Sequence, residues 1–185
     1  MMTNAGPIHY SAVAKVLHWI IALIIVTMLI FGQGFESITS DDEMAFSLTG
    51  HSSLGLTVIA LIMLRILWRI SHPAPPLPQT VSPTQAAAAK VSHGLLYALM
   101  IYVPTTGLYT AAAHDIAIMP YGAFDLRAAL TFVGDDDFAG RRFLHELGTW
   151  LLIALLAVHI GAALLHQFVQ KDGVLRRIWF GQGKG

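Results

Sequence analysis

The sequence predicts an all-α integral membrane protein, folded as a four-helix transmembrane bundle. Of its 185 residues, 55% are hydrophobic and only 12% are charged, a composition that does not suit a water-soluble domain. Four separate stretches are apolar over about 20 residues, the length that a helix needs to cross about 30 Å of hydrocarbon. We expect residues 1–185 to form one domain.

The four expected spans are 16–35, 48–69, 92–113 and 145–169. The first could be taken for a secretory signal, but its apolar run exceeds the about 7–15 residues of a signal core, and no small-residue cleavage site follows it. This helix is therefore expected to remain in the mature protein. The longest connection, 114–144, contains several large apolar side chains, and we expect it to form an interfacial cap over one mouth of the bundle.

Charge is unevenly distributed, although the formal net charge is zero. With the helices placed, one side of the membrane holds eight basic residues against the single acid Asp172, and the other holds ten acids against three arginines. The eight bases are Lys15, Arg65, Arg69, Lys90, Lys171, Arg176, Arg177 and Lys184. The positive-inside rule then places both termini in the cytoplasm, and a bacterial inner membrane fits this arrangement.

Four histidines lie in or at the ends of the apolar runs, and their spacing predicts two pairs. His51 and His145 open the second and fourth spans on the same side of the membrane. His159 follows His145 by 14 residues, which places it about 21 Å deeper and about 40° around the helix axis. His18, near the start of the first span, shares that inner level. Paired imidazoles at two levels are a scaffold for two stacked haems.

Cysteine is absent, which excludes disulfides, iron–sulfur clusters and covalent attachment of a c-type haem, so a redox cofactor here would be held noncovalently. Arg65 stands 14 residues after His51, at the inner level. A charge inside a span usually has an anionic partner, for which a haem propionate is suited, although Arg65 could instead extend to the interface. His93 and His166 lie at inner helix ends, where either is an alternative member of the inner pair and His166 is also a candidate proton or quinone contact.

Several short segments of the chain form a distinctive combination: Leu17-His18-Trp19, His51 with Gly55, Arg65 with Arg69, His93 with Tyr97, Pro104-Thr105-Thr106-Gly107, His145-Glu146 and 158–166. Together these segments resemble the bacterial cytochrome b561 family, four-helix inner-membrane proteins that bind two haems b. Carried over by position, the resemblance implies that His18 and His159 ligate the iron of the cytoplasmic-side haem. It likewise implies that His51 and His145 ligate the iron of the periplasmic-side haem.

An iron with two histidine ligands has no vacant position, so such haems suit outer-sphere electron transfer. The resemblance implies ubiquinone or another membrane quinone as one partner, with superoxide as a candidate donor at the periplasmic face. This makes a quinone-linked oxidoreductase the favoured reading, with membrane lipid as surroundings and no nucleic-acid partner. Arg141 and Arg142 could steer a small anion there, but five aspartates in the same loop weaken that role.

Two other functions stay open. The chain could be a haem b membrane subunit that relays electrons for a separate dehydrogenase or hydrogenase, as similar cytochromes do. It could also be a proton-coupled transporter without haem, although four spans leave little room for inverted repeats around a midplane site.

Overall fold

The computed structural model describes residues 9–130 and 137–180, and every regular element in these ranges is helical. In chain order the elements are α1 (Ala12–Gly32), η1 (Phe35–Ser37), α2 (Asp41–Ser71), α3 (Pro83–Ala111), η2 (Pro120–Gly122), α4 (Leu126–Ala129), α5 (Phe138–Leu164), η4 (Leu165–Gln170) and η5 (Leu175–Arg177). Four of them are long and apolar enough to cross a membrane. The predicted fold class, an all-α membrane protein with four spanning helices, is confirmed.

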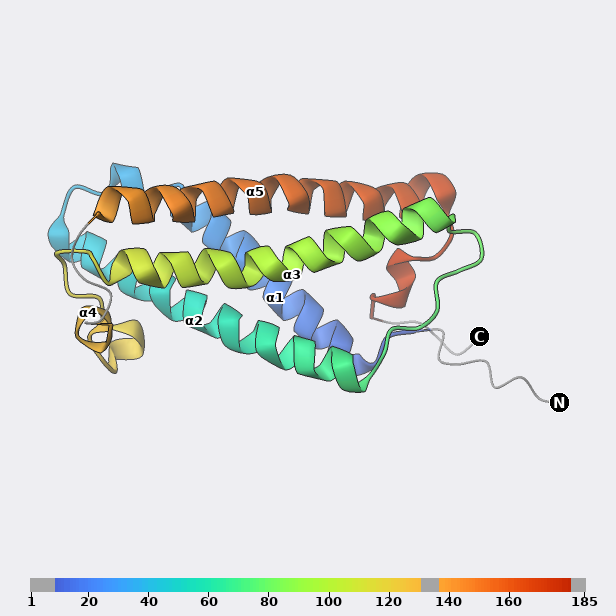
Figure 1. The fold of residues 1–185 in the computed structure, drawn as a ribbon, viewed down its shortest axis with the longest axis horizontal. Helices are drawn as coiled ribbons and strands as arrows, with labels where there is room; N and C mark the ends of the chain where they lie inside the picture. Colours follow the sequence, from blue (N-terminus) through green and yellow to red (C-terminus); the bar gives the residue numbers. More distant parts are fainter. Residues whose placement is uncertain (1–8, 131–136, 181–185) are drawn as a thin grey trace.

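The long helices form a bundle in which α5 packs on α3, α3 on α2 and α2 on α1 (Figure 1). We call the end that holds α4, η1 and the first turns of α2 and α5 the α4 end, and the opposite end, near η5, the η5 end. At the η5 end the two described chain ends meet, because the amide of Tyr10 donates a hydrogen bond to the carbonyl of Arg177. The indole of Trp19 likewise donates to the carbonyl of Ile178.

Side-chain caps, rather than the limits of the apolar runs, mark where three of the four long helices begin. Ser11 caps α1 by accepting a hydrogen bond from the amide of Ala14. Ser82 and Gln85 form a reciprocal capping box at the start of α3, nine residues before the expected 92. Asp137 caps α5, which begins at 138 rather than 145, by accepting from the amide of Gly140. The helix α2 begins at 41 rather than 48 without a side-chain cap.

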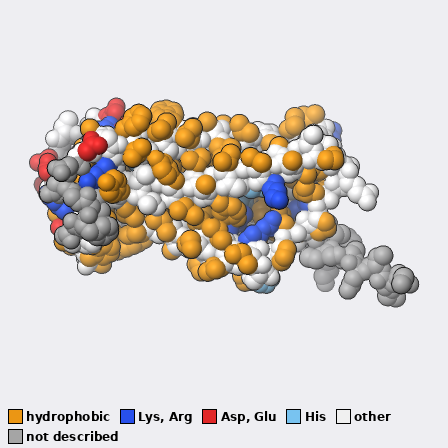
Figure 2. Space-filling view, viewed as in Figure 1, with side chains coloured by type: hydrophobic (Ala, Val, Ile, Leu, Met, Phe, Trp, Pro, Cys, Tyr) orange, Lys and Arg blue, Asp and Glu red, His pale blue; other side chains and the backbone are white. Residues whose placement is uncertain are grey.

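The surface is apolar around the middle of the bundle and charged at its ends. Large side chains such as Leu23, 70% exposed on α1, point away from the bundle, as lipid-facing residues do. On the face drawn in Figure 2, acidic side chains gather at the α4 end, and basic side chains lie in and around a hollow toward the η5 end.

The segment after α3 lies beside α2 rather than over the mouth of the bundle (Figure 1). The amide of Tyr121 donates to the hydroxyl of Ser53, and the phenol of Tyr121 donates to the carbonyl of Ser53. The amide of Met119 donates to the hydroxyl of Thr49, one turn before Ser53 on α2. The described part of the expected interfacial cap is thus docked along a polar stripe of α2, and its last residues form the start of α5. Residues 131–136 of that cap lie outside the described ranges.

Candidate functional site

Two histidines from different helices face each other toward the α4 end. The rings of His51, on α2, and His145, on α5, have centres 6.2 Å apart and planes at 86°. The Nδ1 atom of His145 lies 2.9 Å from the carbonyl oxygen of Val103, a pure acceptor. Nδ1 is therefore the protonated nitrogen, and Nε2 keeps its lone pair for a metal ion.

The second pair lies toward the η5 end. The rings of His18, on α1, and His159, on α5, have centres 6.4 Å apart and planes at 66°. His93, on α3, is also close, with its ring centre 5.4 Å from that of His159. The structure thus brings together the two histidine pairs that the depth argument predicted, and it adds a third imidazole to one of them.

Arg65 belongs to the second site. Its guanidinium donates to the phenol oxygen of Tyr97 at 3.1 Å and to the carbonyl of Ala14 at 2.9 Å. A further nitrogen of Arg65 lies 3.4 Å from Nδ1 of His18. The side chain therefore faces the interior of the bundle instead of extending to the interface.

The spacing of each pair fits an ion held between two imidazoles. With about 2.0 Å for each metal–nitrogen bond and about 1.1 Å from nitrogen to ring centre, two imidazoles on opposite sides of one metal ion have centres about 6.2 Å apart. The pairs at 6.2 Å and 6.4 Å match this value, whereas His93 and His159, at 5.4 Å, are too close. Within residues 9–130 and 137–180, no three histidine, aspartate or glutamate side chains are arranged around one metal position. A haem needs only two protein ligands, because its ring supplies the other four.

An apolar layer separates the two levels. It contains one or two fully buried side chains from each long helix: Ile21, Ile25, Val58, Ile62, Leu96 and Leu152. Leu152 lies midway between His145 and His159 in the sequence, and Val58 follows His51 by the same seven residues. A buried apolar cluster therefore lies between the two histidine pairs.

Gly107, on α3, makes direct room for a histidine. A Cβ atom on Gly107 would lie 3.0 Å from Cε1 of His145, so the imidazole rests against the bare backbone of α3. At Gly148 a Cβ would lie 2.6 Å from the ring of Tyr102, which indicates helix packing instead. Gly161 has nothing within 4 Å.

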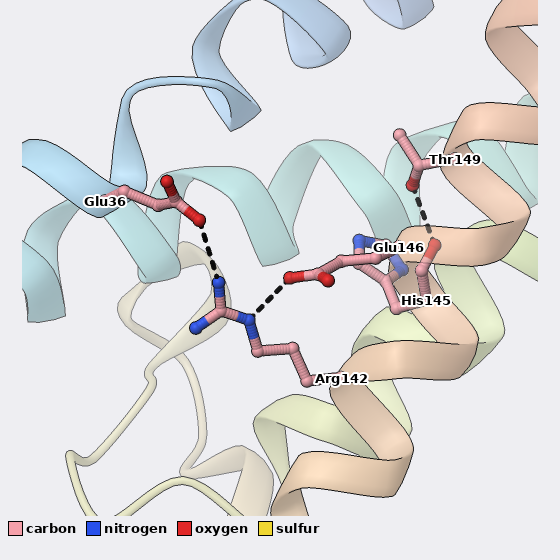
Figure 3. Close-up of polar contacts among 5 residues, drawn as sticks. All are labelled: Glu36, Arg142, His145, Glu146 and Thr149. Carbon is pink, nitrogen blue, oxygen red and sulfur yellow. Dashed lines mark hydrogen bonds and ion pairs between the residues drawn. The ribbon is translucent and has the colours of Figure 1, made fainter.

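The two arginines considered for anion steering both contact other side chains. Arg141 is only 4% exposed, and its guanidinium carbon lies 4.2 Å from the ring centre of Tyr109. Arg142 lies between Glu36 and Glu146, beside His145 (Figure 3). Arg141 is buried, and the half-exposed Arg142 is already paired with two carboxylates, so neither guanidinium is an open anion site.

Sequence reasoning singled out His166 but missed its partner. Nδ1 of His166, in the π-helical turn η4, lies 2.5 Å from a carboxylate oxygen of Asp172. The side chain of Asp172 is 2% exposed, and its other oxygen accepts from the amide of Val174. The available signal was that Asp172 is the single acid on the basic side of the chain. A carboxylate bound to an imidazole nitrogen fixes the orientation of the ring.

Comparisons with known proteins match nearly the whole chain. A family model described as prokaryotic cytochrome b561 matches residues 9–181. The chain is 31% identical to "Cytochrome b561 homolog 2" of Escherichia coli (strain K12) over 175 residues, which cover 93% of this chain and 92% of the relative. It is 30% identical to "Probable superoxide oxidase CybB" of Yersinia pestis over 180 residues, covering 91% and 94%. It is also 29% identical to "Cytochrome b562" of Cereibacter sphaeroides over 174 residues, with the same two coverages.

Proposed function

This chain belongs to the prokaryotic cytochrome b561 family, and we propose that it moves electrons between two haems b and a membrane quinone. The family is one of membrane electron-transfer cytochromes, and membership implies that the chain is a multi-pass membrane protein that binds haem b. The number of haems, their ligands and the partners are the content of the proposal. A bound haem would supply a reversible one-electron carrier with no vacant iron position.

The observation that carries the proposal is the matched spacing of the two histidine pairs. We assign His51 and His145 to the haem of the α4 end, and His18 and His159 to the haem of the η5 end, because both pairs have the separation of axial imidazoles. In the first pair the carbonyl of Val103 already holds the ring of His145 in the tautomer that ligates through Nε2.

Arg65 is assigned to the carboxylates of the second haem. Iron ligation through Nε2 of His18 leaves a proton on Nδ1, and a protonated nitrogen cannot accept from the guanidinium that now lies 3.4 Å away. Arg65 then needs another partner at the same depth, and a haem propionate supplies the negative charge that a cation inside a span requires.

The arrangement supports an electron path along the bundle. His145 and His159 are 14 residues apart on one helix, about 21 Å, so two ring systems held at these levels would have their edges much closer together. The excess of basic residues at the η5 end supports a cytoplasmic location for that end and for both termini, in a bacterial inner membrane. The α4 end then faces the periplasm.

We place the quinone at the η5 end, beside His166. Reduction of a quinone to a quinol takes two electrons and two protons, and His166 is an imidazole that is held in place by the buried carboxylate of Asp172. With Nδ1 bound to that carboxylate, Nε2 is the atom that would give a proton to a quinone oxygen or take one from a quinol.

Oxidation of superoxide at the α4 end is the second candidate function. It is favoured by the name of the Yersinia pestis relative, "Probable superoxide oxidase CybB", which is 30% identical to this chain. In that reaction superoxide would lose one electron and leave as dioxygen, and the electron would pass along the bundle to the quinone.

The decisive experiment is a reduced-minus-oxidised visible spectrum of the purified chain, with haem measured against protein, followed by addition of a quinone. We expect two b-type haems per chain, which the quinone reoxidises after chemical reduction. One haem per chain would contradict the proposed ligand pairs. Two haems that a quinone does not reoxidise would point instead to an electron-relay subunit for a separate dehydrogenase or hydrogenase, and a colourless protein would refute the proposal.

Substitution of Gly107 tests how the haem of the α4 end is seated. In Gly107→Val the added side chain meets the ring of His145, so we expect the haem content to fall by at least about half a haem per chain, all of it from the α4 end. Gly161→Ala is the matched control, because nothing lies within 4 Å of the added Cβ, and both haems should remain. Equal haem content in the two variants would show that Gly107 does not position His145.

A further inference from the structure

We propose that the electric field at the α4 end slows the approach of small anions and favours positively charged electron donors, and that Glu36 and Glu146 set this selectivity by neutralising Arg142. The inference rests on the proposed function, specifically on electron uptake at the His51–His145 pair. It specifies the class of donor that the proposed function leaves open.

The guanidinium of Arg142 is held on two sides. Its Nε donates to Oε1 of Glu146 at 2.5 Å, and its Nη2 donates to Oε1 of Glu36 at 3.3 Å (Figure 3). One cation between two carboxylates leaves a net charge of −1 for the three residues. The three residues together therefore contribute a negative field to their surroundings.

This ion-paired triad lies beside both histidines of the α4 end. Glu146 directly follows His145 in α5. Glu36 directly follows Phe35, whose ring centre is 5.3 Å from that of His51. The triad joins η1 to α5, next to the two side chains through which electrons would be taken up, so its charge acts on any small donor that approaches them.

The net charge of the other groups at the α4 end has the same sign as that of the triad. Arg141 is buried against Tyr109, and Arg127 lies 3.9 Å from a carboxylate oxygen of Asp115. Three acids in the first turn of α2 are exposed: Asp41, Asp42 and Glu43. Among the described residues, this side of the chain holds eight acids and three arginines, so the sum of their formal charges is 3 − 8 = −5.

A field of this sign changes association rates in opposite directions for donors of opposite charge. Superoxide is an anion at neutral pH and is repelled, whereas a cationic donor is attracted, and such fields alter on-rates by about 10–10³-fold at low salt. Salt screens exposed charges over about 10 Å at 0.1 M, so raising the ionic strength weakens both effects. The sign of the salt dependence therefore reports the sign of the field that the donor meets.

The test measures reduction of the haems of the full-length holoprotein in a stopped-flow instrument, with superoxide as the anionic donor and the methyl viologen radical cation as the cationic donor. Between low and high ionic strength we expect the superoxide rate to rise by at least about threefold and the viologen rate to fall by a similar factor. A superoxide rate that falls with salt would overturn the inference.

Three variants test whether the triad causes the salt dependence of the superoxide rate. Glu36→Gln and Glu146→Gln release Arg142 on one side, so both should raise the superoxide rate at low salt and flatten its salt dependence. Glu43→Gln removes the same charge from a residue outside the triad and should change the rate less. Equal effects of all three variants would show that net charge alone, and not the hold on Arg142, sets the selectivity.

The outcomes separate this inference from the proposed function. If chemically reduced haems are not reoxidised by a quinone, the proposed function fails whatever the salt dependence. If a quinone reoxidises them and neither charged donor shows the expected slope, the function stands and the inference fails. Because Glu36 and Glu146 lie at the α4 end, changes that they cause report electron uptake there and not at the η5 end.

Discussion

Replacing His51 or His145 with alanine is expected to lower the haem content from about two to about one per chain, with loss of the haem at the α4 end alone. Replacing His18 or His159 should remove the haem at the η5 end alone. The reason is that, in the proposed assignment, each iron would have two protein ligands at its own level, and a buried apolar cluster lies between the two levels.

Haem extraction against protein concentration, together with low-temperature spectra that resolve the two haems, measures this result. His93→Ala is the matched control, since His93 lies 5.4 Å from His159, too close to be its axial partner, and both haems should remain. Loss of a haem in His93→Ala with retention in His18→Ala would transfer the ligand role to His93. Equal haem content in all four pair variants would contradict the assignment altogether.

The helical repeat explains why the histidine pairs could be predicted from the sequence. A membrane-spanning helix has a fixed rise per residue and a fixed span, so the position of a histidine within an apolar run determines its depth. His145 and His159, 14 residues apart, also had to share nearly the same face. The same reasoning placed Arg65 near His18, where the structure puts its guanidinium 3.4 Å from the ring.

Helix ends and the path of the long connection could not be predicted in this way. Hydropathy marks the apolar core of a span, but α3 begins nine residues before that core because Ser82 and Gln85 cap it. The segment after α3 docks on α2 through tertiary hydrogen bonds at Ser53 and Thr49, and Tyr121 adopts a left-handed backbone conformation with φ 55°. Such contacts leave no periodic trace in the sequence.

The partners of the charged side chains at the two ends could not be predicted from the sequence either. The sequence indicated that Arg142 lies near His145, and only the structure shows that Glu36, 106 residues away in the chain, neutralises it. Asp172 was counted as an exception to a basic face, whereas the turn of η4 brings its carboxylate to His166. A balance of charges predicts the sign of a surface but not the pairing of its members.

Substitutions in the His166–Asp172 pair are expected to slow reoxidation by quinone by about 10²-fold while leaving two haems per chain, which is the effect of losing one positioned proton donor. Asp172→Asn removes the carboxylate that orients the ring of His166, and His166→Gln removes the proton-carrying ring itself. The double variant should be no slower than His166→Gln, because Asp172 acts through His166. Stopped-flow reoxidation of the reduced protein by a short-chain quinone measures the rate.

The size and the additivity of these effects decide whether the pair acts on the quinone or only shapes the C-terminal turn. A structural role would lower haem content or thermal stability in both variants, whereas a proton-transfer role spares both and slows the quinone step alone. Gln170→Ala, an exposed change in the same π-helical turn, is the control and should retain the full rate. An unchanged rate of reoxidation in His166→Gln would show that His166 does not exchange protons with the quinone. The buried carboxylate of Asp172 would then serve only to anchor the turn through the amide of Val174.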